Sequence, residues 1–205
     1  MKSVFVVGDS ISMHYGPHLE LYIQGWCDYA RKSEGDAGLR ALGDSQSANG
    51  GDSSAVLTYL QAVRDSAGLT ADALLVNCGL HDIKTDPSSG AKQVPIELYE
   101  RNLQGIVDVA SGMGVELVWI RTTPAVDKIH NKPGATFHRF AADCAAYNAV
   151  ADALMAENQV PVIDLFGFTL QLGDNVFCDH VHFHPPIREK QAAYIAGWLQ
   201  RHFDR

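Results

Sequence analysis

Four near-continuous apolar runs constrain the fold of this chain more than any other feature of its sequence. They lie at residues 3–7, 73–78, 115–120 and 160–165. Strands that are covered on both faces have this pattern, whereas strands with one face in water alternate apolar and polar residues. The runs therefore predict four buried strands of a mainly parallel sheet.

Segments with helical spacing separate these runs. They are centred on residues 56–63, 98–110, 140–155 and 187–203. Strands and helices that alternate in this way predict a three-layer α/β/α sandwich. A weaker apolar stretch at residues 39–42 is expected to complete a five-stranded sheet. Because no internal repeat or change in composition divides the 205 residues, we expect a single domain over residues 1–205.

Composition and charge exclude several classes of partner. The formal net charge is −8, and no cluster of lysine and arginine is present, which argues against nucleic acid and anionic membrane surfaces as partners. No apolar stretch is long enough for a signal peptide or a membrane span, so we expect a cytoplasmic protein. Cys27 and Cys78 lie in apolar surroundings, which favours buried free thiols, although one disulfide remains open.

Four unusual stretches follow the four predicted strands. They read GDS at residues 8–10, GLHD at 79–82, RTTP at 121–124, and CDHVHFHPP at 178–186. In open parallel α/β sheets, sites gather at the carboxyl ends of the strands. We therefore expect these stretches, which are distant in the sequence, to meet at one edge of the sheet.

Ser10 is either a helix cap or a nucleophile. Gly8-Asp9-Ser10 alone favours a cap, with Ser10 or Ser12 closing the start of a helix. A nucleophilic serine needs a base, and the chain offers one at His182, three residues after Asp179. That spacing lets one ring nitrogen donate to the carboxylate while the other faces the serine.

The histidines near the C-terminus also allow a metal site. His180, His182 and His184 alternate, so they share one face if the segment is extended. No second cluster of Cys, His or Glu accompanies them. We therefore predict neither a metal nor another cofactor.

Two further motifs each have a structural and a functional interpretation. The glycine-rich stretch SANGGDSS at residues 47–54 is either a loop capped by Asp52 or Ser53, or a close approach to a ligand in which the Gly51 N–H donates to an oxyanion. His81 follows a buried strand and is either a satisfied core residue or part of a site.

Taken together and in order, these motifs resemble the SGNH (GDSL-type) hydrolase family over nearly the whole chain. That family has a Gly-Asp-Ser nucleophile block, an oxyanion glycine in its second block and a final Asp-x-x-His block. The resemblance implies a flavodoxin-like α/β/α fold, with Ser10, Asp179 and His182 as the catalytic triad and Gly51 as an oxyanion donor. The third block differs, because His81 stands where the family usually has asparagine. An imidazole N–H can donate as an amide does, so we interpret His81 as a substituted oxyanion donor.

The resemblance implies a metal-independent serine esterase. We expect a small acyl ester as substrate, with an O-acetylated saccharide preferred because the loops around the site are polar. Other candidate site residues are Asp9, which is expected chiefly to hold its own turn, and His14, Tyr15, Thr123 and His130. A thioesterase or lysophospholipase, a non-catalytic binding module and a metal-dependent hydrolase are the alternatives.

Overall fold

A computed structural model describes residues 1–33, 48–66 and 68–204. Five parallel strands form one sheet in the order β2-β1-β3-β4-β5. The strands are β1 (Lys2–Val7), β2 (Cys27–Arg31), β3 (Ala73–Val76), β4 (Glu116–Ile120) and β5 (Val162–Ile163). The predicted parallel, five-stranded sheet is confirmed.

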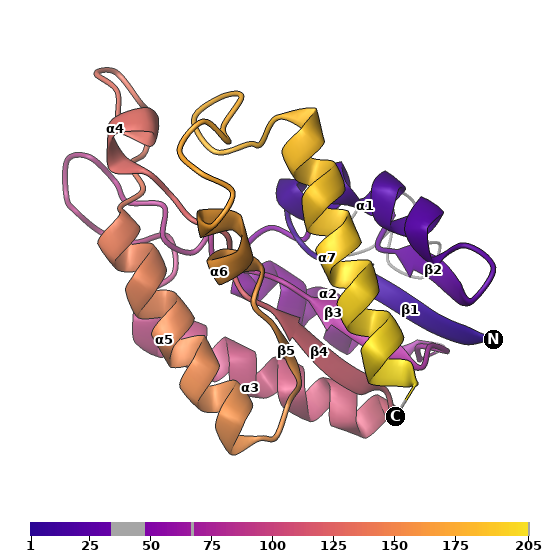
Figure 1. The fold of residues 1–205 in the computed structure, drawn as a ribbon. Coiled ribbons are helices and arrows are strands. Elements are labelled where there is room, and N and C mark those ends of the chain that lie inside the picture. Colours follow the sequence, from indigo (N-terminus) through magenta and orange to yellow (C-terminus); the bar gives the residue numbers. More distant parts are fainter. Residues whose placement is uncertain (34–47, 67, 205) are drawn as a thin grey trace.

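Helices cover both faces of the sheet, which confirms the three-layer architecture (Figure 1). On one face α1 packs against α7, and α6 also contacts α7, whereas on the other face α3 contacts both α2 and α5. The helices are α1 (Ser10–Ile23), α2 (Ser53–Asp65), α3 (Ile96–Met113), the short α4 (Asp127–His130), α5 (Ala141–Glu157), α6 (Leu165–Leu170) and α7 (Pro185–Phe203).

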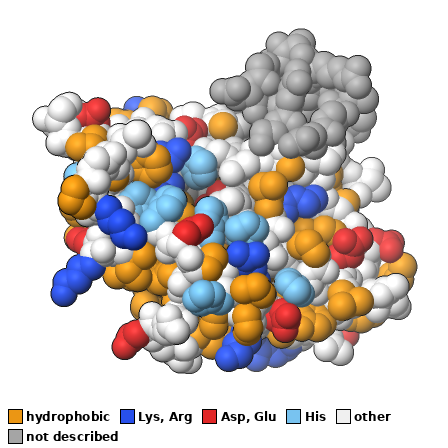
Figure 2. Space-filling view, turned by 90° about the horizontal axis from the view of Figure 1, so that it is seen from above, with side chains coloured by type: hydrophobic (Ala, Val, Ile, Leu, Met, Phe, Trp, Pro, Cys, Tyr) orange, Lys and Arg blue, Asp and Glu red, His pale blue; other side chains and the backbone are white. Residues whose placement is uncertain are grey.

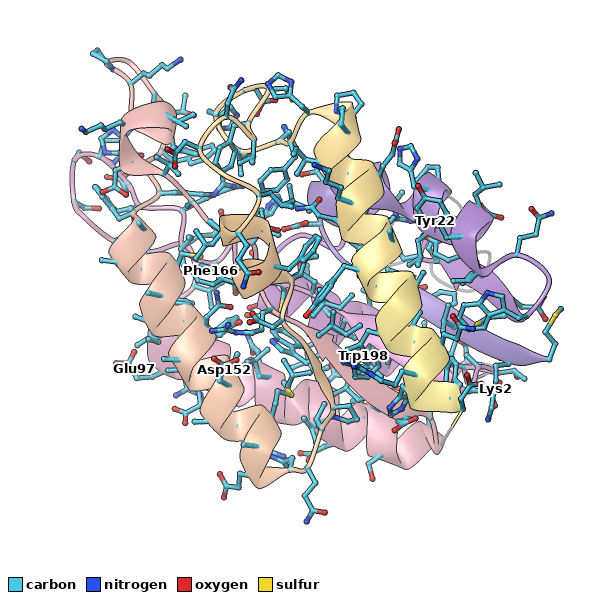
Figure 3. All side chains as sticks on the ribbon, in the orientation of Figure 1. Lys2, Tyr22, Glu97, Asp152, Phe166 and Trp198 are labelled. Atoms are coloured by element: carbon cyan, nitrogen blue, oxygen red, sulfur yellow. The ribbon has the colours of Figure 1, made fainter. Side chains whose placement is uncertain are left out.

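The core lies between these layers, on the three central strands. All four residues of β3 are buried, and Trp119 of β4 is fully enclosed. Burying one large apolar side chain contributes roughly 1.5–3 kcal/mol, so the continuous apolar runs also supply much of the stability. Figure 3 shows side chains from the helices and the sheet filling the space between the layers, with Phe166 labelled on α6 and Trp198 on α7.

The strands differ from the predicted ones in two places. The chain forms β2 at Cys27–Arg31, a segment that we did not predict, because an edge strand alternates buried and exposed residues instead of forming an apolar run. The predicted strand at residues 39–42 lies outside the described residues. The run at 160–165 yields only the two-residue β5, because the Asp164 side chain accepts the Gly167 N–H at 2.9 Å and starts α6.

All four cysteines are free thiols, and only Cys178 is exposed. Within the described parts of the chain, we find no helix that combines the length and the apolar character needed to cross a membrane.

Candidate active site

Ser10 is the first residue of α1 and directly follows the turn after β1. The cap of this helix is Asp9, whose side chain accepts the Ile11 N–H at 2.9 Å. The Ser12 hydroxyl donates to the Asp9 carbonyl at 2.7 Å. The expectation that Ser10 or Ser12 caps the helix is therefore wrong, and the Ser10 hydroxyl is available for another partner.

That partner is His182, which comes from the loop before α7. The Ser10 Oγ lies 2.8 Å from His182 Nε2, and His182 Nδ1 lies 2.7 Å from Asp179 Oδ2. With the proton on Nδ1, the imidazole donates to the carboxylate and accepts from the serine hydroxyl. The three side chains thus form an unbroken hydrogen-bond chain across 172 residues of sequence.

Backbone groups fix the carboxylate at the end of this chain. Asp179 Oδ1 accepts the N–H groups of Val181 at 2.8 Å and His182 at 2.7 Å. Burial raises the pKa of Asp179, but these two N–H groups and the His182 imidazole outweigh it and hold that pKa well below its usual range. Asp179 is therefore ionised at neutral pH, and the 44% exposure of its side chain also favours the charged form.

Further histidines surround His182. The ring of His14, one turn along α1 from Ser10, lies 4.7 Å from that of His182, and His180 lies 4.7 Å from His130, centre to centre. Burial, followed by the charges of Arg188 and His182, lowers the pKa of His14. Figure 2 looks onto the molecule from above and shows histidine side chains gathered near the middle of this face, beside lysine and arginine side chains.

The glycine-rich turn lies against the serine segment. The Gly50 N–H donates to the Gly8 carbonyl at 2.9 Å, which joins the two turns directly. Gly51 has a φ of 74°, and its N–H donates to the side-chain oxygen of Asn49 at 2.9 Å. The predicted oxyanion donor is thus near Ser10 in the fold but already has an acceptor within its own loop.

The segment after β3 is tied to the same turn through Asp82. Both carboxylate oxygens of this buried residue accept the Ser53 N–H, at 2.9 and 3.1 Å, which links the start of α2 to the GLHD stretch. Burial raises the pKa of Asp82 to about 7. A side chain at Gly79 would place its Cβ 2.3 Å from the Thr122 hydroxyl, so only glycine fits where this loop passes the end of β4.

The His81 imidazole has no hydrogen-bond partner among the described residues. Burial, followed by the charges of Lys84 and Arg139, lowers the pKa of His81 to about 4. The ring is therefore neutral at neutral pH and carries one N–H and one acceptor nitrogen. Such a ring can donate to an anion, but it is not a cation there.

The other predicted site residues lie in different environments. Tyr15 is only 1% exposed and belongs to the hydrophobic core, so the expectation that it lines the pocket is wrong. Thr123 is buried, and its carbonyl accepts a hydrogen bond from Cys144 Sγ at 3.4 Å. His130 is also buried, but it borders a cavity.

That cavity has a volume of about 470 Å³ and adjoins the hydrogen-bond chain at Asp179. Small-molecule sites in proteins commonly have volumes of several hundred Å³. Its wall combines apolar and polar groups, and is formed by His130, Lys132, Pro133, Gly134, Ala135, Thr136, Phe137, Asp179 and His180.

The segment with the three alternating histidines is not extended. It folds back on itself, with Phe177 and Phe183 forming an antiparallel bridge, and both ring nitrogens of His182 are already paired. His184 begins α7 as its N-terminal cap residue. Over residues 1–33, 48–66 and 68–204, no three His, Cys, Asp or Glu side chains are grouped as metal ligands would be.

Sequence reasoning missed two polar residues near the site. Asn49 lies inside the glycine-rich stretch that we had singled out, so its amide was a signal that we did not use. Arg139 lies in the loop before α5, and nothing in its local sequence marks it as buried, although it is 4% exposed.

Comparisons with known proteins agree with this fold. A lipase/acylhydrolase from Enterococcus faecalis superposes with a TM-score of 0.72 at 15% identity, covering 98% of this chain and 97% of that one. The acetyl xylan esterase AlAXEase gives 0.68 at 13% identity, over 96% and 99% of the two chains. The esterase EstA of a Pseudoalteromonas species, solved with monoethylphosphonate as inhibitor, gives 0.67 at 12% identity over the full length of both.

No curated protein matches the sequence. At these low identities, the structural matches establish the fold alone. The sequence itself matches the GDSL-like lipase/acylhydrolase family over residues 6–186, which includes all three residues of the hydrogen-bond chain. Because this match covers most of the chain, the protein belongs to the GDSL-like lipase/acylhydrolase family, in agreement with the resemblance drawn from its motifs.

Proposed function

We propose that this protein is a serine esterase that hydrolyses short acyl esters, acetyl esters in particular, on a saccharide. The observation that carries the proposal is the hydrogen-bond chain from Ser10 through His182 to Asp179, with links of 2.8 and 2.7 Å. A serine hydroxyl that faces one ring nitrogen of an imidazole, with the other nitrogen held by an ionised carboxylate, is an activated nucleophile.

The reaction then proceeds in two halves. Ser10 Oγ attacks the ester carbonyl while His182 Nε2 takes the hydroxyl proton, and Asp179 stabilises the imidazolium that forms. His182 returns this proton to the departing alcohol, which leaves an acyl group on Ser10. Water, deprotonated by the same imidazole, then attacks the acyl-enzyme. The bond between the acyl group and Ser10 Oγ breaks, His182 gives its proton to Ser10 Oγ, and the acid is released.

Negative charge on the carbonyl oxygen needs donors during both attacks. We assign this role to the N–H groups of Ser10 and Gly51 and to the His81 imidazole. Ser10 is the first residue of α1, where N–H groups lack intrahelical acceptors and favour nearby negative charge. Gly51 fulfils the role once the oxyanion replaces Asn49 as its acceptor.

The choice of substrate rests on the cavity beside Asp179. Histidines, a lysine and a threonine contribute to its wall, and Phe137 offers one aromatic ring. A sugar presents hydroxyls to such polar groups, and its C–H face to the apolar groups that form the larger part of the wall. The likeness to an acetyl xylan esterase supports the same substrate class.

Covalent labelling tests the nucleophile. A fluorophosphonate probe is expected to label the wild-type protein and neither Ser10→Ala nor His182→Ala, with loss of p-nitrophenyl acetate hydrolysis in both variants. Equal labelling of wild type and Ser10→Ala would refute the assignment. A panel of p-nitrophenyl esters tests the acyl group, because faster turnover of octanoate than of acetate contradicts a short-chain esterase. Release of acetate from acetylated xylan tests the saccharide.

A further inference from the structure

Arg139 is a buried cation beside the proposed oxyanion hole. Only 4% of its surface is exposed, and none of the ion pairs between described residues includes it. Moving a charged group out of water is costly unless its hydrogen-bonding capacity is used. Its neighbours therefore indicate what the guanidinium does.

The guanidinium joins two loops of the site. Its Nε donates to the carbonyl of Leu80, the residue between Gly79 and His81, and its Nη1 donates to His130 Nε2 at 2.7 Å. The guanidinium carbon lies 4.9 Å from the centre of the Phe137 ring. One side chain thus connects the oxyanion segment to the loop that forms a wall of the cavity.

Hydrogen bonds within that loop hold both Arg139 and His130 in place. The oxygen of the Asn131 side chain accepts the Arg139 backbone N–H at 2.8 Å and lies 3.2 Å from His130 Nδ1. With a proton on Nδ1, the His130 ring donates to Asn131 and accepts from the guanidinium. Consistent with this neutral form, burial and then the charge of Arg139 lower the pKa of His130 to about 4.

The positive charge of Arg139 also affects the ionisation of residues near Ser10. Burial lowers the pKa of Arg139 only to about 10, so the guanidinium is positive at neutral pH. Burial raises the pKa of Asp9, and the positive charge of Arg139 partly offsets this rise. The same charge contributes to the lowered pKa of His81, which keeps that ring neutral.

We propose that Arg139 is a positioning residue for the oxyanion hole, which fixes the Leu80–His81 peptide against the 130–139 loop. The inference rests on the proposed esterase function. Arg139 acts through the segment that carries His81 and does not itself touch the substrate. Its loss is therefore expected to displace the His81 donor during turnover while leaving Ser10, His182 and Asp179 paired.

Arg121 provides a matched control at the end of the neighbouring strand β4. It is also partly buried, but it pairs with Asp164 at 2.6 Å and Asp152 at 2.8 Å, and its guanidinium lies 5.2 Å from the Phe166 ring. Figure 3 labels Asp152 on α5 and Phe166 on α6, the two helices that meet Arg121. We expect Arg121→Met to lower the melting temperature with little change in kcat.

The experiment compares kcat and KM of the wild type, Arg139→Met, Arg139→Lys and Arg121→Met with p-nitrophenyl acetate, beside their melting temperatures. Arg139→Met is expected to lose about 10- to 100-fold in kcat, the scale of a misplaced catalytic group, with a smaller change in KM. Arg139→Lys keeps the charge but not the two-sided contact, so we expect an intermediate kcat.

A double-mutant cycle with His81→Ala tests whether Arg139 affects kcat through His81. If Arg139 acts through His81, the double variant is about as slow as His81→Ala alone, whereas independent effects multiply. Multiplying effects, or a folded Arg139→Met with wild-type kcat, overturn the proposal. Should Arg139→Met not fold, Arg139→Lys decides in the same cycle. A wild type that is neither labelled by fluorophosphonate nor active refutes the esterase function instead, so the two failures are distinguishable.

Discussion

The two halves of the candidate site differ in how far they are assembled before substrate binds. On one side, Ser10, His182 and Asp179 are joined by hydrogen bonds of 2.8 and 2.7 Å. On the other, the Gly51 N–H is occupied by Asn49, and the His81 ring has no hydrogen-bond partner in the described part of the chain. For the proposed esterase, this difference means that the nucleophile is activated in advance, whereas the oxyanion donors are completed by the substrate, as catalytic hydrogen bonds often are.

The assembled half should be the more sensitive to a small chemical change. In Asp179→Asn, an amide NH2 replaces one of the oxygens that accept from the imidazole and from two backbone N–H groups. The amide favours the wrong tautomer of His182, so we expect kcat to fall on the order of 10⁴-fold with little change in structure. Steady-state hydrolysis of p-nitrophenyl acetate measures this loss.

Asp174→Asn is the matched control for that change. Asp174 is exposed in the same segment, and its amide should leave kcat unaltered. If Asp179→Asn retains more than a tenth of wild-type kcat, the hydrogen-bond chain does not drive the reaction, and the contrast between the two halves disappears.

The incomplete half should lose less. His81→Ala removes one oxyanion donor, which corresponds to about 10²–10³ in kcat. His81→Asn should recover part of this loss, because an amide also offers an N–H. His202→Ala is the control, since that histidine lies in the last turn of α7, at the end far from His182, and is paired with Glu116 of β4 at 3.1 Å. Full activity in His81→Ala would remove His81 from the mechanism.

The Gly51→Ala variant tests two properties of this residue, the position of its N–H and the strain of its backbone. Gly51→Ala places a side chain at a φ of 74°, which costs on the order of 1–2 kcal/mol, and its Cβ meets that of Ala55 at 3.3 Å. We expect an accompanying loss of about tenfold in kcat, because relief of this strain displaces the N–H. Melting temperature and kcat, measured together, test both parts.

Gly25→Ala supplies the matched control for strain alone. Gly25 has a φ of 88° and nothing within 4 Å of its added Cβ, and it lies between α1 and β2. It should lose comparable stability at unchanged kcat. Equal kcat in the two alanine variants would separate Gly51 from the oxyanion.

The features of this molecule that could be predicted from the sequence are those that depend on residue type and spacing alone. Buried strands such as β3 require apolar runs, and Asp179 and His182 carry a spacing with a chemical meaning. Strand β2 escaped prediction because every second residue of this particular edge strand is exposed, so its sequence contains no apolar run. The partners of Arg139 lie 9 and 59 residues away, and only the folded topology brings them together.

The smallest expected effect concerns pH and again belongs to the His81 side of the site. Burial holds the pKa of His81 at about 4, below the value of 6.5 that it has in the unfolded chain. The unfolded state therefore binds the extra proton first as pH falls, so stability is full above pH 6.5 and declines between pH 6.5 and about 4. His130, whose pKa is also about 4, adds a loss of stability as pH falls. Asp82, with its pKa raised to about 7, has the opposite effect and stabilises the protein as pH falls through that value.

Because the effect of Asp82 opposes that of the histidines, the test compares His81→Asn with the wild type at each pH. We expect the free energy of unfolding of the wild type to fall by roughly 1–3 kcal/mol more than that of the variant between neutral pH and pH 4. Equal changes in the free energy of unfolding of the two proteins over that range would mean that His81 is as solvated when folded as when unfolded, which contradicts the burial of its ring.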